Sequence, residues 1–392
     1  MRTSISLCPA MVLGVLALTA CPDDSSAVDA ASGQDAAVVD SAAGDIGSPD
    51  STGTPDAAVT ADGATRPDGA VGADGSMQVD GGTIADAAQP GGQYFPSTSF
   101  MYQDVSQAAL DPNSSAITRW LADNGGWGFS RFQIDFSIEV LEAESSTPYV
   151  TLDYDPDWLP DCDTLDFPIP AGGRLEGETG YSCASAGDCH LIVADRRVNR
   201  LYEMWQADYT GGVLSGTCEA VWDMTRVYPA EGRGEQCTSA DAAGFPIAPL
   251  LFTADEVAAG EIAHAIRFIL PNARMRADWY VHPATHAGGP SASSADAPTY
   301  GTRWRLKSDF DVSGYSAGAQ VVARALKKYG MLLADGGNVA LTAQADTFTT
   351  AKWDSLLGSH DLVGIEPTDF EVVATDPPIA LTYDCVRTPE SW

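Results

Sequence analysis

Four side chains in the second half of the chain are candidates for acid–base catalysis, because histidine and carboxylate groups can transfer protons near neutral pH. They are His264, His286, Asp241 and Asp223. In a strand over residues 261–268, His264 would share a face with apolar neighbours, while Arg267 would lie on the opposite face. A buried, hydrogen-bonded histidine fits this pattern as well as a catalytic one, and a turn-forming role also fits Asp241.

Cationic and aromatic side chains are candidates for ligand binding. Alternation along residues 303–310 places Arg303, Arg305 and Lys307 on one face of a strand. Such a cationic row could bind the carboxylates of a uronic acid, or it could pair with acidic residues of the chain itself. The other candidates for ligand contacts are Arg267, Trp205 and Trp222. Both tryptophans have a carboxylate nearby in the sequence, which is common at sugar-binding sites and also at ordinary sheet edges.

Metal and cofactor motifs are weak. His282 and His286 are four positions apart, but Pro283 disfavours the helical turn that would bring both onto one metal ion. Asp309 and Asp311 would supply too few oxygen ligands for calcium. The motifs of phosphate-binding loops, serine hydrolases and zinc proteases do not occur. We therefore expect no metal and no cofactor.

Strand patterns dominate the segments that must position these residues. A hairpin is predicted over residues 190–205, and further strands over residues 131–140, 149–154, 218–224, 261–270, 302–310, 331–334 and 369–373. Helices are predicted over residues 114–124 and 316–330, and a short one near Asp255. Many strands with few helices predict a mainly β domain, as a β-sandwich or jelly roll with peripheral helices.

Six cysteines fall in the globular part, and an even number in an exported protein predicts three disulfides. They are Cys162, Cys183, Cys189, Cys218, Cys237 and Cys385. The short loop from Cys183 to Cys189 suits a local bridge. The next most natural pair is Cys218 with Cys237, which leaves Cys162 with Cys385.

The first residues form a signal for export. An apolar run from Met11 to Ala20 follows Arg2 and ends at Cys21, and the ending Leu18-Thr19-Ala20-Cys21 resembles the lipobox of bacterial lipoproteins. The resemblance implies a signal peptide over residues 1–20, cleavage before Cys21 and lipidation of its sulfur. An acylated Cys21 would anchor the protein in a lipid bilayer. We expect a bacterial membrane-anchored lipoprotein, at the outer membrane or cell surface rather than the inner membrane.

Residues 21–92 are rich in Asp, Ala and Gly and contain no aromatic residue, so they cannot build a core. Aspartates recur every five or six positions from Asp24 to Asp86, and their repulsion should extend the chain. One carboxylate in five or six residues is too sparse for a calcium-binding repeat. We expect a disordered tether that holds a single β-rich domain, residues 93–392, away from the membrane.

The charge of the chain excludes one class of partner. It carries 54 acidic and 21 basic residues, a net charge of −33. Nucleic-acid binding needs a basic surface, so we expect no nucleic-acid partner. The expected partners are the lipid bilayer, through Cys21, and a polysaccharide, and we expect a monomer.

Several segments, in order, resemble a family of exported bacterial proteins of no established activity. The resemblance covers about residues 100–373 and rests on segments 190–205, 220–223, 238–247, 256–267, 283–286, 303–307 and 325–335. Where that family commonly reads Ala-Asp-Asn-Gly, residues 334–337 of this chain read Ala-Asp-Gly-Gly. The resemblance implies one continuous domain and assigns no reaction.

Three functions are compatible with the sequence. The first is a glycan-active hydrolase or lyase on an acidic polysaccharide, because the polar candidates include acids, bases and cations. The second is a non-catalytic carbohydrate- or surface-binding module, and the third a structural envelope lipoprotein. The sequence alone does not decide whether the protein is an enzyme.

Replacing Cys21 with serine removes the sulfur that lipidation requires. We expect the Cys21→Ser protein to leave the membrane fraction or to remain unprocessed in fractionated cells. Unchanged membrane partition of this variant would rule out the lipid anchor.

Overall fold

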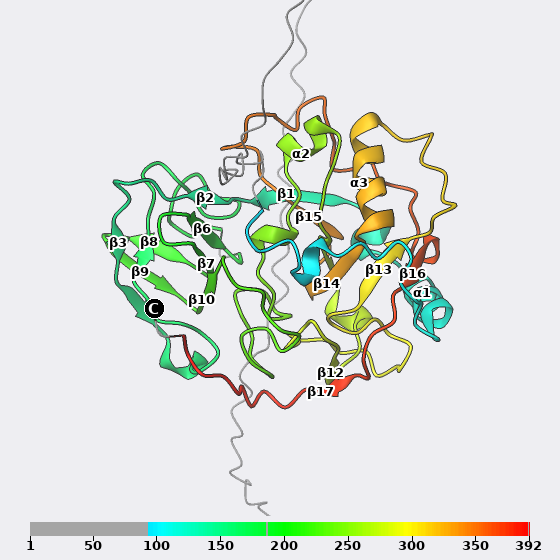
Figure 1. Ribbon diagram of the computed structural model, residues 1–392, viewed down its shortest axis with the longest axis horizontal. Coiled ribbons are helices and arrows are strands. Elements are labelled where there is room, and N and C mark those ends of the chain that lie inside the picture. The colour runs from blue at the N-terminus through cyan, green and yellow to red at the C-terminus, as the bar shows by residue number, and fades with distance from the viewer. Residues whose placement is uncertain (1–92, 186, 391) are drawn as a thin grey trace, which may run out of the picture. The chain divides into compact units, whose positions relative to one another are not determined.

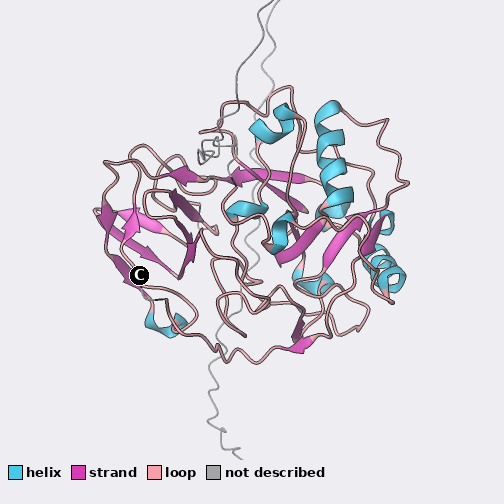
Figure 2. Ribbon diagram, viewed as in Figure 1, coloured by secondary structure: helices cyan, strands magenta, loops and turns pink. Residues whose placement is uncertain are grey.

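Strands make up most of the regular structure in the computed structural model, which describes residues 93–392 apart from residues 186 and 391 (Figures 1 and 2). The described residues lie within one compact unit of the chain. The expected signal peptide, the lipidation at Cys21 and the tether lie outside the described residues. None of the helices in the described part is long and apolar enough to cross a membrane.

A mixed sheet of six strands, here called the large sheet, forms the centre of the fold. Its strands, in spatial order, are β1 (Ile134–Ile138), β15 (Leu341–Gln344), β11 (Ile266–Leu270), β14 (Met331–Gly336), β13 (Arg303–Leu306) and β16 (Phe370–Val372). The pairs β1–β15 and β11–β14 are parallel, while β13 pairs antiparallel with both β14 and β16. Strands that are neighbours here are far apart in sequence, so side chains from distant segments meet on one face.

A second sheet, here called the small sheet, contains β10 (Cys218–Asp223), β7 (Arg200–Trp205), β6 (Leu191–Asp195) and β2 (Leu141–Glu142). The predicted hairpin is confirmed as β6–β7. Alternate residues of this sheet belong to two different apolar cores: Ile192 and Trp222 pack with the large sheet, whereas Val193 and Tyr202 pack on the other side. Because both faces are covered, β6 is buried along its whole length.

The other strands form three small ribbons: β3 (Tyr149–Val150) with β5 (Phe167–Pro168), β4 (Leu152–Tyr154) with β9 (Val213–Gly216) and β8 (Asp208–Thr210), and β12 (Trp279–Tyr280) with β17 (Ile379–Ala380). The expectation of a mainly β domain with few helices is confirmed. The finer expectation of a β-sandwich is not shown, because the described strands form several mixed sheets.

Within residues 93–392 three α-helices lie around the sheets: α1 (Ser114–Asp123), α2 (Ala254–Ala259) and α3 (Ala317–Lys328). The Ser316 hydroxyl accepts a hydrogen bond from the Ala319 amide and caps α3, as the sequence predicts. Gly330 follows the helix with φ 71°, and a Cβ there would lie 2.6 Å from the Trp304 carbonyl oxygen. Only glycine fits this turn, which leads from α3 directly into β14 (Figure 1).

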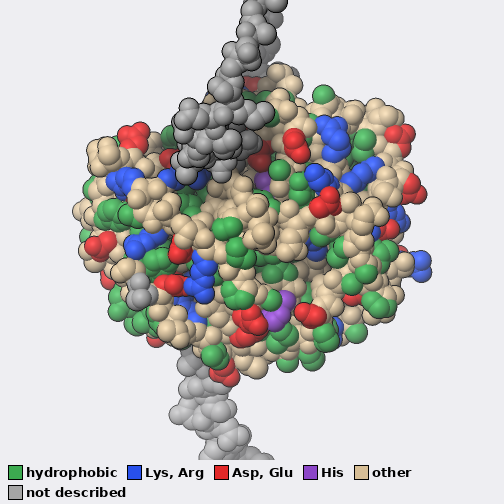
Figure 3. Space-filling view, viewed as in Figure 1, with side chains coloured by type: hydrophobic (Ala, Val, Ile, Leu, Met, Phe, Trp, Pro, Cys, Tyr) green, Lys and Arg blue, Asp and Glu red, His purple; other side chains and the backbone are tan. Residues whose placement is uncertain are grey.

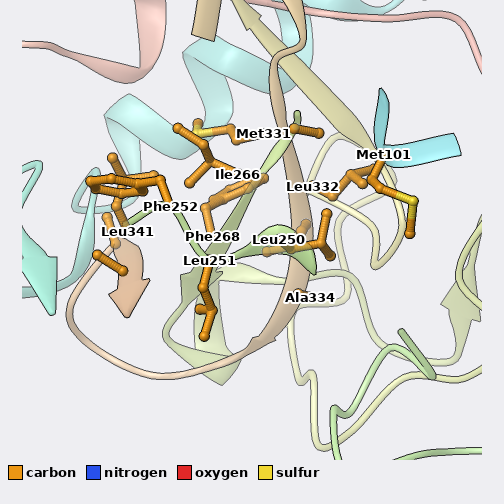
Figure 4. Packing of buried hydrophobic residues seen from close by; sticks show 14 of the residues in the cluster. Met101, Leu250, Leu251, Phe252, Ile266, Phe268, Met331, Leu332, Ala334 and Leu341 are labelled. Atoms are coloured by element: carbon orange, nitrogen blue, oxygen red, sulfur yellow. The ribbon is translucent and has the colours of Figure 1, made fainter. Parts of the chain in front are cut away.

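The main apolar core surrounds the middle of the large sheet. Figure 4 shows Ile266 and Phe268 of β11 gathered with Phe252 and Met331, all of them fully buried. The indole of Trp127 packs against Phe268 at a ring separation of 6.4 Å. Apolar packing therefore fixes β11, and with it the polar residue Arg267 between Ile266 and Phe268.

All six cysteines of the described part form disulfides: Cys162–Cys218, Cys183–Cys189 and Cys237–Cys385. The local bridge is confirmed. The expected pairs Cys218–Cys237 and Cys162–Cys385 are wrong, because the turn after residue 158 lies against the start of β10 while the C-terminal segment returns to Gln236. Three disulfides indicate an exported protein, since reducing compartments do not maintain them.

The disulfide pattern predicts a specific peptide map. A digest of the unreduced protein should release peptides that contain Cys162 and Cys218 joined together, and likewise Cys237 and Cys385. Thiol labelling of the unfolded, unreduced domain should detect no free cysteine among these six. Joined peptides containing Cys218 and Cys237 would contradict the fold at this point.

Candidate functional site

The most unusual feature of the domain is a buried arginine on the central strand of the large sheet. Arg267 is 4% exposed. Its Nε donates to Asp241 Oδ1 at 2.8 Å, its Nη2 to Asp335 Oδ2 at 2.7 Å and its Nη1 to Thr342 Oγ1 at 3.0 Å. We call Arg267, Asp241, Asp335 and Thr342 the Arg267 cluster. Burying a charge is costly unless it is paired, so these partners are needed for Arg267 to be buried.

The large sheet itself assembles most of this cluster. Arg267 lies on β11, between Thr342 on β15 and Asp335 at the end of β14. Asp135 on β1 is paired in register with Thr342, which extends the polar row across a fourth strand. Burial raises the pKa of the Asp135 carboxyl. The row thus runs across adjacent strands of the sheet.

Asp241 reaches the cluster from a loop that is locked from several sides. The Ser239 hydroxyl accepts from the Asp241 amide at 3.0 Å and donates to the Phe245 carbonyl at 2.7 Å. Gly244 has φ 79°, and a Cβ there would lie 2.1 Å from the Thr285 hydroxyl, so no larger residue fits. The Ala243 amide donates to the Ala334 carbonyl of β14, which ties the loop to the large sheet.

Glu203 on β7 holds the far end of the same loop. Its carboxylate accepts from the amides of Ile247 and Ala248, both at 2.8 Å, and from Trp222 Nε1 at 3.1 Å. Glu203 is fully buried, and burial raises its pKa to about 7 in spite of these hydrogen bonds. The small sheet and the large sheet therefore both position the loop that carries Asp241.

The two carboxylates of the cluster bind neighbouring nitrogens of one guanidinium group, which places them side by side. Burial raises the pKa of Asp241 to about 7, the Arg267 charge opposes this shift and the Asp335 charge adds to it. Burial also raises the pKa of Asp335, again against Arg267. Asp241 Oδ2 is buried and has no hydrogen-bond partner among the described residues. One proton shared by this pair near neutral pH is the natural consequence.

A second ion pair borders the cluster. His190 Nδ1 lies 2.6 Å from Glu176 Oε2, and His190 Nε2 lies 3.1 Å from the carbonyl oxygen of Ala240, next to Asp241. Burial opposes the charge on His190, but the Glu176 carboxylate outweighs it and raises the histidine pKa to about 9. Burial likewise opposes the charge on Glu176, yet His190 lowers its pKa to about 2. Both groups are therefore charged at neutral pH.

The site reaches solvent through its acidic members. The Asp335 and Glu176 side chains are 24% and 17% exposed, whereas Asp241 is fully buried. Exposed Asp188 lies at the same edge, because its charge acts on both His190 and Asp335. Asp188 Oδ1 accepts a hydrogen bond from Trp205 Nε1 at 3.3 Å, which connects this edge to a partly exposed tryptophan.

The structure brings two of the residues singled out in the sequence into direct contact, namely Asp241 and Arg267. His286 lies beside them: its Nδ1 is 3.0 Å from the carbonyl oxygen of Ala242, and burial lowers its pKa. With Trp205 at the exposed edge, four of the sequence candidates fall in or next to the site.

His264 and Asp223 do not join this group. The expected strand over residues 261–270 begins only at Ile266, so His264 precedes it and instead contacts Glu256 of α2 at 3.3 Å. Asp223 closes a turn, with its carboxylate accepting from the Thr225 amide at 2.9 Å. These contacts account for the positions of both residues without a catalytic role.

The cationic row is used inside the protein. Arg303 donates to the Phe100 carbonyl at 2.7 Å, and Arg305 binds Glu371 at 2.7 Å and the Val105 carbonyl. Lys307 donates to the Thr368 carbonyl at 2.6 Å. These contacts tie the segment before α1 and the residues at β16 to β13. The donor groups of the row are therefore engaged within the protein rather than offered to a ligand. Trp222 is buried and binds Glu203, as described above.

Among the described residues, one group of three side chains has metal-ligand spacing: Glu178, Cys183 and Cys189. Both sulfurs are already joined in a disulfide, so they do not supply thiolates. His282 contacts Glu235 at 2.5 Å, while His286 contacts the Ala242 carbonyl, so the two histidines have separate partners. Asp311 accepts from the Ser313 amide in a turn.

Asp335, Thr342, His190 and Glu176 were not among the candidates drawn from the sequence. Asp335 ends a parallel strand, where functional side chains often lie, and this position was an available signal. His190 and Glu176 had no such signal, because their pairing depends on a loop that folds back across 14 residues.

The raised pKa of Asp241 predicts how stability depends on pH. Its pKa rises from 3.8 in the unfolded chain to about 7 in the folded one, so the folded state holds a proton that the unfolded state loses in this interval. The stability that this proton contributes is present below about pH 4 and is lost as the pH rises through 7. In Asp241→Asn the side chain stays neutral and isosteric.

Urea titration gives the free energy of unfolding of the wild type and of Asp241→Asn at each pH. We expect the wild-type value minus the Asp241→Asn value to fall by about 2–4 kcal/mol from pH 4 to pH 8. The subtraction removes the groups that titrate in this range independently of Asp241, and it retains the titration that Asp335 and Glu203 share with Asp241. A difference that stays constant or grows with pH would show that Asp241 is ionised throughout.

No family model matches the chain, and comparisons with curated proteins and with solved structures found no match. The function of the Arg267 cluster must therefore be argued from its own geometry.

Proposed function

We propose that the protein is an exported glycan hydrolase whose reacting groups are Asp335 and Glu176. The observation that carries the proposal is the opposite pKa shift of two partly exposed carboxyls whose charges both act on Arg267. Burial raises the pKa of Asp335, while the pKa of Glu176 is lowered to about 2 by His190 against the effect of burial. Glycoside hydrolysis needs one protonated and one ionised carboxyl, and carboxyls with pKa values pushed apart supply this pair.

In this mechanism Asp335 is the general acid, since 24% of its side chain is exposed and can touch a substrate. It gives its proton to the glycosidic oxygen as the bond to the sugar carbon breaks. The Glu176 carboxylate stabilises the positive charge that develops on the sugar. A water molecule then adds to the carbon, and its proton returns to Asp335.

Asp241 and Arg267 act as positioning residues, because both are too deeply buried to touch a substrate. Arg267 fixes the Asp335 carboxyl, while burial, with the charge of Asp188 adding to it, keeps the pKa of Asp335 raised. His190 holds Glu176 ionised. Each proposed role thus follows from a contact within the site.

The charges favour a neutral or amino sugar over an acidic one. Asp188, Asp335 and Glu176 form the exposed edge of the site, and the arginines expected to bind a uronate are engaged inside the protein. On the face seen in Figure 3, basic and acidic side chains are interspersed. An anionic polysaccharide would be repelled by the site edge.

We further propose that lipidated Cys21 holds this domain at the cell envelope, on the basis of the lipobox-like ending of the apolar run. The three disulfides agree with an exported location. A non-catalytic carbohydrate-binding module is the second candidate. It is favoured by the partly exposed indoles of Trp158 and Trp205, which lie 5.7 Å apart.

Substitution of the two carboxyls tests the catalytic proposal. We expect Asp335→Asn and Glu176→Gln each to lower kcat/KM by about 10²–10⁴-fold on neutral β-glucans or chitin oligosaccharides, measured by release of reducing ends. Asp223→Asn is the matched control, since its carboxylate only closes a turn, and it should retain full activity.

Thermal unfolding of the same variants separates loss of chemistry from loss of fold. Equal activity of Asp335→Asn and wild type would remove Asp335 from the mechanism. Absence of turnover by the wild type on the whole panel would favour the binding module.

A further inference from the structure

Two tryptophans lie against each other at the surface beside the small sheet. The rings of Trp158 and Trp205 are 5.7 Å apart at 77° to each other, and both side chains are partly exposed. Trp158 belongs to neither apolar core. Apolar burial therefore does not explain its position.

A nearby disulfide holds the segment of Trp158 against the strand next to Trp205. Trp158 ends the 3₁₀ turn η3 (Pro156–Trp158), whose N-cap Asp155 accepts from the Asp157 amide, and the Cys162 amide donates to the Trp158 carbonyl at 3.1 Å. Cys162 is bonded to Cys218, and Cys218 is the residue paired in register with Trp205 on the adjacent strand. The disulfide thus fixes the turn of Trp158 directly beside Trp205.

Polar groups lie beside Trp205. Trp205 Nε1 donates to Asp188 Oδ1 at 3.3 Å, the Gln206 amide donates to the Asp188 carbonyl at 2.8 Å, and the Thr217 hydroxyl donates to Gln206 Oε1 at 2.6 Å. Gln206 and Asp188 are exposed. They offer hydrogen-bond acceptors and donors at the edge of an apolar surface.

Tyr154 is a further exposed aromatic residue, on the ribbon that adjoins β7. It is 45% exposed and is paired in register with Gly216, the neighbour of Thr217. The Thr217 amide donates to the Trp205 carbonyl at 3.0 Å, so the ribbon that carries Tyr154 adjoins β7 at this point.

We propose that Trp158 and Trp205 form a binding subsite for a pyranose unit of a neutral glycan chain. Pyranose rings have an apolar face that packs on an indole, and hydroxyl groups around the edge that need polar partners, and both are present here. Two indoles at right angles form a corner that can contact one sugar ring on its face and on its edge. The acidic neighbour Asp188 disfavours an anionic sugar.

The subsite deepens the proposed function, on which its substrate class rests. Asp188 links the two places, because it binds Trp205 and acts electrostatically on His190 and Asp335. A chain that packs on the tryptophans would extend along Asp188 toward the proposed general acid. Binding at the subsite does not itself require hydrolysis.

The test uses the full-length protein with cellohexaose, N-acetylchitohexaose and hexagalacturonate, followed by tryptophan fluorescence and by calorimetric titration. We expect at least one neutral hexasaccharide to bind and to change the fluorescence, and hexagalacturonate to bind at least tenfold more weakly. Trp158→Ala should raise the Kd of that neutral hexasaccharide tenfold or more, and Trp158→Phe should raise it less, since an aromatic ring remains.

Tyr383→Ala is the matched control, because Tyr383 is also an exposed aromatic residue but lies against His286 rather than at the subsite. It should bind as the wild type does. If Trp158→Ala unfolds, Trp158→Phe and Trp205→Phe decide the question on folded protein.

Three results would overturn the inference: failure of both neutral hexasaccharides to bind the wild type at millimolar concentration, unchanged affinity in the Trp158 variants, or preference for hexagalacturonate. Asp335→Asn distinguishes this inference from the catalytic proposal. It should retain hexasaccharide affinity while losing turnover, so that loss of one property does not imply loss of the other.

Discussion

The charge of Arg267 in the middle of an apolar sheet is the constraint on which the rest of the site depends. A buried guanidinium needs acceptors on every side. Two strands and one loop provide them through Thr342, Asp335 and Asp241. The loop is in turn held by Glu203 of the small sheet, so the two sheets are coupled through polar contacts as well as through the shared apolar core.

Burial and the partner that each group receives explain why carboxyl groups of the domain differ so much in their proton affinity. Asp241 and Glu203 lie where burial outweighs their hydrogen bonds, whereas Glu176 lies against a histidine that outweighs burial. This acidic chain buries several carboxyls, and the partner that each one receives decides whether it keeps its proton. Chemistry that needs both forms at one pH can use this difference.

Local patterns predicted the elements better than their assembly. The hairpin β6–β7, the capped helix α3 and most strands follow from alternation and capping residues, because these signals lie within a few positions. The disulfide partners of Cys162 and Cys237 and the contact of His190 with Glu176 depend on how distant segments return. Arg303 and Arg305 alternate with Trp304 along β13 as predicted. Alternation does not show that main-chain carbonyls accept hydrogen bonds from both guanidinium groups. Asp241 and Arg267 could be singled out because a position between two predicted strands and a position within one are both local signals.

The bridge between Cys237 and Cys385 closes a covalent ring across a sequence separation of 148. Asp241, Arg267, Asp335 and Thr342 all lie within that ring. A single cut by a protease in any loop between the two cysteines would therefore leave the two pieces joined through the disulfide. All four residues of the Arg267 cluster would stay in one covalently connected molecule. For a protein exposed to secreted proteases, the ring allows damage to one loop without loss of any part of the site.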